Sequence, residues 1–197
     1  MASKLTQLAK QKTAAQLQTA SRDAYRWLAK KIGSLSNPTG IASIINREES
    51  RTTESFNPGK LFFFYYDPKT KKDLPYYDKF PLVLVLEKQN DGFLGLNLHY
   101  LPIQYRVAFL DKLMDYAVLD KNKDIERMRV SYEILSTTSR YKEFKPCLKK
   151  YLYSQVQSKM LMVLPNEWDI AAFLPIQQFR KATANQVWQE SIEEIKE

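Results

Sequence analysis

The pattern of apolar and polar positions changes character at Gly59. Beyond it, apolar and aromatic residues form short runs that turn residues separate. The runs "LFFFYY" (61–66), "FPLVLVLEK" (80–88) and "FLGLNLHY" (93–100) each predict a strand. The middle run is almost continuously apolar, which is typical of a strand buried on both faces. The "QNDG" sequence at 89–92 predicts a turn between the last two of these strands.

The second half of the chain mixes helical and strand periodicities. Residues 103–119 place apolar side chains on one helical face, and residues 126–135 alternate as in a half-buried strand. We expect a helix at 145–158, with Pro146 near its first turn, and two further strands at 159–165 and 168–175. Thr183 and Gln186 have the spacing of a capping box for a final helix over 184–196.

Six short strands with interspersed helices predict an α+β protein. The expected core is a small curved β-sheet or an SH3/OB-like barrel with flanking helices, and a flat mixed sheet is the alternative. The side chains expected to be buried around this sheet are Phe62, Phe64, Val83, Val85, Leu96, Leu98, Val130, Ile134 and Phe173.

The chain before Gly59 has a different composition. Residues 1–32 are rich in Ala, Gln and Lys and predict a basic helical N-terminal arm. Residues 33–58 hold mostly small polar residues and predict a linker, which leaves 59–197 as the α+β core domain.

Charge is concentrated in the arm and the start of the linker. The chain carries a net +8, and residues 1–47 hold eight basic residues against one acid, Asp23. Such asymmetry indicates a polyanionic partner, although a solvated basic tail would look the same. The candidate phosphate-binding residues are Lys4, Lys10, Lys12, Arg22, Arg26, Lys30 and Lys31.

Composition argues against several other classes of protein. The apolar runs are too short to cross a bilayer, and the N-terminus lacks the apolar region of a signal peptide. Cys147 is the only cysteine, which fits a reducing compartment, and one cysteine with one histidine cannot build a four-ligand zinc site. We expect no membrane partner, no cofactor and no small-molecule substrate.

No catalytic motif is evident, so we expect no catalytic or metal-binding residues. The single histidine, His99, lies in a strand-like run without a triad signature and is expected to be a hydrogen-bonded structural group. A magnesium nuclease would use Asp78 with Glu87 and Lys88, but the adjacent lysine departs from the usual Glu-x-Lys spacing. Asp78 is expected to be a turn residue, as are Asp67 and Asp73.

The aromatic run at 61–66 could in principle stack on nucleic-acid bases. It contains no basic residue, however, so burial on both faces of a sheet explains it better.

A short internal similarity links "HYLPIQYR" (99–106) with "AFLPIQQFR" (172–180). Each places Leu-Pro after an aromatic residue and an arginine just beyond. The two could be equivalent strand exits on one barrel, or the similarity could be chance.

Four longer segments carry a resemblance to a known family. They are "GKLFFFYYDPKTKKDLPYYDKFPLVLVLE", "GFLGLNLHYLP", "PCLKKYLYSQVQSK" and "EWDIAAFLPIQQF" with "QVWQES". Over roughly 59–192 the chain resembles virion proteins of T-even-type contractile-tailed phages, commonly labelled DNA end protector proteins.

The resemblance implies a non-enzymatic virion protein, assembled in the host cytoplasm. It would act at head completion or the head–tail junction, on the double-stranded DNA end and beside other head, neck or tail proteins. Two alternatives remain: a neck, tail or baseplate assembly subunit whose arm docks on other virion proteins, and a magnesium-dependent nuclease.

Overall fold

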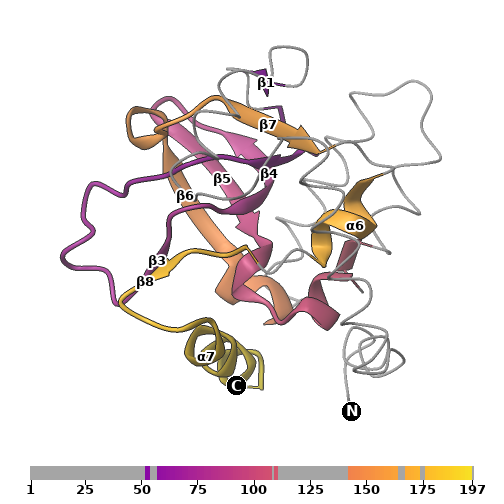
Figure 1. Ribbon diagram of the computed structural model, residues 1–197. Coiled ribbons are helices and arrows are strands. Elements are labelled where there is room, and N and C mark those ends of the chain that lie inside the picture. The colour runs from indigo at the N-terminus through magenta and orange to yellow at the C-terminus, as the bar shows by residue number, and fades with distance from the viewer. Residues whose placement is uncertain are drawn as a thin grey trace.

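The computed structural model describes residues 52–53, 57–107, 109–110, 142–163, 167–173 and 176–196. Its centre is a six-stranded antiparallel sheet with the order β1-β7-β2-β4-β5-β6 (Figure 1). The strands are β1 (Thr52–Thr53), β2 (Leu61–Phe63), β4 (Leu82–Lys88), β5 (Gly92–Asn97), β6 (Leu148–Leu152) and β7 (Met160–Val163). A separate pair joins β3 (Tyr77–Asp78) to β8 (Phe179–Arg180).

Helical segments complete the described structure. They are the 3₁₀ turns η1 (Leu98–Tyr100), η2 (Lys142–Cys147) and η3 (Tyr153–Gln155), and the α-helices α6 (Trp168–Ala172) and α7 (Ala184–Lys196). Residues 103–107 and 109–110 are also helical. The predicted α+β class is confirmed. No pairing among the described residues joins β1 to β6, so closure into a barrel stays a prediction.

Both faces of the central strands are buried. Leu61 and Phe63 of β2 belong to a cluster on one face of the sheet that also holds Leu82 and Leu84 and side chains of α6 and α7. The alternate side chains of the same strands form a second cluster on the other face, which includes Phe62, Phe64, Val83, Val85, Phe93 and Tyr151. Because successive side chains point to opposite faces, an uninterrupted apolar run supplies both cores.

The expected core is confirmed wherever the structure describes it. Seven of the side chains expected to be buried are at most 6% exposed: Phe62, Phe64, Val83, Val85, Leu96, Leu98 and Phe173. Val130 and Ile134, the strand predicted at 126–135 and the second half of the helix predicted at 103–119 lie outside the described residues.

The predicted helix at 145–158 is wrong. Lys142–Cys147 form a 3₁₀ turn, and Leu148–Leu152 form β6, which pairs with β5 along its whole length. The spacing of Cys147, Leu148, Tyr151 and Leu152 suits a helix, but the open edge of β5 offers a row of N–H and C=O groups that a strand satisfies. Pairing with a distant strand therefore overrides the local pattern.

The predicted strand at 168–175 is also wrong. Trp168–Ala172 form α6, which places Trp168, Ala171 and Ala172 against the core. The indole Nε1 of Trp168 donates a hydrogen bond to the carbonyl oxygen of Val163 at 3.0 Å, which fixes the start of this helix next to the end of β7.

Side-chain hydrogen bonds to the backbone determine where β5 ends and where α7 begins. The strand predicted at 93–100 stops at Asn97, because the Asn97 side chain accepts the backbone N–H of His99 and starts η1. The predicted capping box is confirmed. The backbone N–H of Gln186 donates to Oγ1 of Thr183, and the backbone N–H of Thr183 donates to Oε1 of Gln186. β1 lies inside the predicted linker and pairs with β7, so the sheet takes up part of that segment.

A first prediction concerns Gly92, at the start of β5 opposite Leu152. A Cβ atom there would collide with the backbone carbonyl of Tyr151, and a backbone group cannot move aside as a side-chain tip can. Gly92→Ala should therefore lower the unfolding free energy by about 1–3 kcal/mol. Urea denaturation measures this, with the exposed Lys88→Ala as a control expected within about 0.5 kcal/mol of wild type. An unchanged Gly92→Ala would contradict the β5–β6 register.

Candidate nucleic-acid interface

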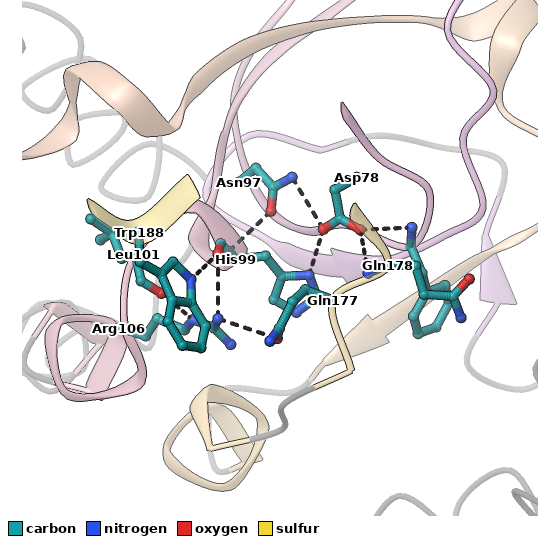
Figure 2. Close-up of polar contacts among 9 residues, drawn as sticks. Asp78, Asn97, His99, Leu101, Arg106, Gln177, Gln178 and Trp188 are labelled. Atoms are coloured by element: carbon teal, nitrogen blue, oxygen red, sulfur yellow. Dashed lines mark hydrogen bonds and ion pairs between the residues drawn. The ribbon is translucent and has the colours of Figure 1, made fainter. Parts of the chain in front are cut away.

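A buried polar network lies where β3, η1 and the segment before β8 meet (Figure 2). Nδ1 of His99 lies 2.6 Å from Oδ2 of Asp78, and both side chains are fully buried. The other carboxylate oxygen of Asp78 accepts the backbone N–H groups of Phe80 and Gln178, at 3.0 and 2.9 Å. Asp78 thereby ties β3 to a segment one hundred residues further along the chain.

The second half of the network is centred on Arg106, which is fully buried. Its Nε donates to the carbonyl oxygen of Leu101 at 2.7 Å, and its Nη2 donates to the carbonyl of His99 and to Oε1 of Gln177. The guanidinium also lies over the Trp188 ring, and the indole Nε1 of Trp188 donates to the same His99 carbonyl at 2.8 Å. Arg106 therefore joins the helix at 103–107 to α7 and to the chain before β8 (Figure 2).

Electrostatics decide the protonation of the buried pair. Burial opposes ionisation of Asp78, but the His99 ring and the hydrogen bonds to the carboxylate outweigh it and lower the pKa of Asp78. Burial lowers the pKa of His99 more than the Asp78 carboxylate raises it. A neutral His99 then donates Nδ1–H to Asp78, and its Nε2, which has no hydrogen-bond partner among the described atoms, carries no proton. His99 is therefore hydrogen-bonded and buried as expected, and its structural role stays a prediction.

A second prediction follows from these pKa shifts. The unfolded chain protonates His99 near its ordinary pKa of 6.5, but the folded chain resists that protonation, so the unfolded state binds more protons below that pH. The unfolding free energy should therefore fall between pH 7 and 5, with a slope from this group of at most about 1.4 kcal/mol per pH unit. Asp78 adds a further loss at lower pH, below the ordinary carboxyl pKa of 3.8.

Denaturation at a series of pH values measures this dependence. His99 is the only histidine in the chain, so His99→Gln should flatten the curve between pH 7 and 5. An equally steep curve in that variant would show that other groups carry the effect.

The two similar segments meet in this network but are not equivalent. The first runs from β5 through η1 into a helix, whereas the second runs from α6 into β8. Gln177 of the second accepts a hydrogen bond from Arg106 of the first. The expectation of two equivalent strand exits is wrong, because the second segment leaves a helix.

An open pocket of about 510 Å³ lies beside the network, between β6 and the segment 66–78. We call it the tyrosine–lysine pocket. Its lining includes five tyrosines, Tyr66, Tyr76, Tyr77, Tyr100 and Tyr151, and three lysines, Lys69, Lys149 and Lys150. Asp78 and Asn97 also line it, so the buried network supports one of its walls.

The three lysines differ in their surroundings. The Lys150 ammonium is paired with Asp91 at 2.9 Å and is half exposed. The Lys149 ammonium lies 4.4 Å from the centre of the Tyr100 ring and makes no hydrogen bond or salt bridge with a described residue, but the Glu194 carboxylate acts on it electrostatically. Burial lowers the pKa of Lys149. Lys69 is exposed at the rim.

The seven basic residues predicted to bind phosphate, Lys4, Lys10, Lys12, Arg22, Arg26, Lys30 and Lys31, lie outside the described residues, so their role stays a prediction. Asp78 is not the turn residue that we expected, because it is buried in β3 and hydrogen-bonded to His99. Glu87 and Lys88 are both exposed on β4. Within the described ranges, no three His, Cys, Asp or Glu side chains gather as metal ligands would.

The tyrosine–lysine pocket was not predicted from the sequence. One signal was present, since "PYY" (75–77) and "KKY" (149–151) together hold three of the five tyrosines and two of the three lysines of the pocket. The two segments lie about seventy residues apart, and the second was predicted as a helix. Nothing in the sequence therefore indicated that they line the same pocket. In the part of the chain that the structure describes, no helix is both long and apolar enough to cross a bilayer.

Comparison with known families identifies the class of protein. A family model described as "Phage T4 terminal DNA protecting protein" matches residues 4–191. The chain is therefore a bacteriophage protein of a DNA-binding, DNA-end-protecting class. It belongs to the family of phage T4 terminal DNA protecting proteins, and the match takes in the basic arm as well as the sheet. Neither the curated proteins nor the solved structures gave a match.

Proposed function

We propose that this protein binds the end of the packaged double-stranded DNA and shields it, without enzymatic activity, through contacts to phosphate that do not depend on base sequence. The observation that carries the proposal is the family match over 4–191. The +7 charge of residues 1–47 supports it, because lysine and arginine release counterions from phosphate and need no base contacts.

The composition of each part of the chain supports a different role for it. The arm of residues 1–32 would contact DNA, the linker 33–58 would connect it, and residues 59–197 would form a compact body. We place this protein in the virion, at head completion or the head–tail junction and beside other head, neck or tail proteins, after assembly in the host cytoplasm. The buried Asp78–His99–Arg106 network supports a structural role for the polar groups of the core, because burial keeps them from substrate.

An end-protection assay tests this function. A linear duplex labelled internally is incubated with a processive exonuclease, with and without the full-length protein, in the presence of a covalently closed circular competitor. We expect the linear duplex to survive and the circle not to relieve protection at equal mass. Protection that the circle abolishes would indicate general coating of DNA and would contradict end binding.

Mixtures of the protein and the duplex without the exonuclease distinguish the alternative functions. If the protein shows no affinity for DNA at low salt, the arm serves a protein neighbour in a neck, tail or baseplate assembly. If it cleaves DNA when Mg²⁺ is added, and Glu87→Gln abolishes the cleavage in a folded protein, the nuclease hypothesis replaces ours.

A further inference from the structure

We propose that the tyrosine–lysine pocket holds the terminal nucleotide of the DNA, with its base against tyrosine and its phosphate at the lysine rim. This inference rests on the proposed function and adds a second, local site on the folded core. The pocket's volume of about 510 Å³ is that of a small-molecule site, so it suits one unpaired nucleotide and not a duplex.

The aromatic wall offers a ring that is free to stack. Among the tyrosines of the pocket, Tyr66 and Tyr151 are buried against each other, and Tyr76 and Tyr100 pack on Phe179. Tyr77 is only half buried and makes no ring contact with any aromatic residue that the structure describes. Bases of any sequence stack on such rings, which fits a protein that must accept any terminal base.

The cationic rim is suited to a phosphate. Lys149 is largely buried beside Tyr100 and makes no salt bridge with a described residue, although Glu194 acts on it electrostatically, whereas Lys150 is already paired with Asp91. A phosphate would give the Lys149 ammonium a directly hydrogen-bonded anion, in addition to the Glu194 carboxylate that acts on it from further away. Lys69 can add a second cation from the opposite rim.

The charge of the buried Asp78 acts on the ligand without touching it. Asp78 lines the pocket with its side chain fully buried, and the His99 ring and the hydrogen bonds to the carboxylate lower its pKa, so it stays ionised. Negative charge at the buried Asp78 and positive charge at the lysines disfavour a phosphate deep in the pocket and favour it at the rim. The uncharged base then occupies the inner part.

The pocket is built before any ligand arrives. Lys181, whose φ of 69° lies in the left-handed region, extends its ammonium to the carbonyl oxygens of Lys72 and Leu74 at 2.7 and 2.8 Å. On the other side, the Tyr66 hydroxyl accepts the backbone N–H of Leu152. These contacts hold the loop that contains Lys69 and the strand that contains Lys149 on opposite sides of the pocket, so little conformational freedom is lost on binding.

The test uses the full-length protein and a linear duplex with one unpaired nucleotide at each end. A fluorescent base analogue that reports stacking is placed either at that terminal position or at an internal one. We expect the protein to change the fluorescence of the terminal analogue only. Tyr77→Ala and Lys149→Gln should each weaken affinity for this duplex about tenfold, whereas Tyr77→Phe, which keeps the ring, should bind as wild type does.

Matched control variants distinguish the pocket assignment from the proposed function of end binding. Tyr153→Ala and Lys60→Gln alter a half-buried tyrosine and a lysine outside the pocket and should leave affinity unchanged. If wild type prefers open ends but the terminal analogue is silent and the pocket variants bind normally, the pocket assignment is wrong and the proposed function stands.

Two further outcomes are equally decisive. If wild type fails to prefer open ends over closed circles, the proposed function itself fails. If a free mononucleotide competes as well as the duplex with unpaired ends, the pocket is a site for free nucleotides, which overturns the assignment to DNA ends.

Discussion

Arg106→Ala is expected to lower the unfolding free energy by about 3–5 kcal/mol. The guanidinium is fully buried and donates to the carbonyl oxygens of Leu101 and His99 and to Oε1 of Gln177. Alanine would leave buried acceptors without donors and a cavity where the side chain packs against Trp188. Since small domains are stable by only about 5–15 kcal/mol, the loss would be a large fraction of the total.

The measurement is urea denaturation followed by circular dichroism, with Arg180→Ala as the matched control. Arg180 is the exposed residue of β8, so its truncation should change the unfolding free energy by less than about 0.5 kcal/mol. Arg106→Lys keeps the charge but loses the planar fork that reaches several acceptors at once, so its stability should fall between wild type and Arg106→Ala. If Arg106→Ala matched the Arg180→Ala control, the network would not hold α7 and the 103–107 helix together.

Affinity for a blunt DNA duplex is expected to fall on the order of a hundredfold between 50 and 200 mM salt. Each phosphate neutralised contributes roughly −0.9 to the slope of log K against log salt, and this estimate takes four or five of the seven candidate arm residues as engaged. A scrambled duplex should bind equally well, because phosphate contacts carry no sequence information.

A matched pair of variants tests whether the arm causes the slope of log K against log salt. Lys10, Lys12 and Lys30 are changed to glutamine in one variant, and Lys60, Lys88 and Lys196 of the core in the other, so both lose three charges. The arm variant should have a slope shallower by about 2–3, and the core variant should keep the wild-type slope. Equal slopes in the two variants would show that net charge, not the arm, determines binding.

The sequence by itself determined the elements whose pattern is local. The apolar run of β4, the turn before Gly92 and the Thr183–Gln186 capping box are each specified within a few residues, and the structure has all three. The composition also determined the charge asymmetry, because counting needs no structure. The resemblance found in the four quoted segments agrees with the family match.

The tertiary structure alone decided what depends on distant partners. Leu148–Leu152 form a strand because β5 has an open edge, although their own spacing favours a helix. Asp78 is a buried partner of His99 and not a turn residue, because Gln178 supplies a backbone N–H from far along the chain. The tyrosine–lysine pocket has the same origin, since residues 66–78 and 148–152 form its walls. Hydrophobic periodicity reports which side of an element is buried but not which element covers it, so a site assembled across such contacts has no local signature.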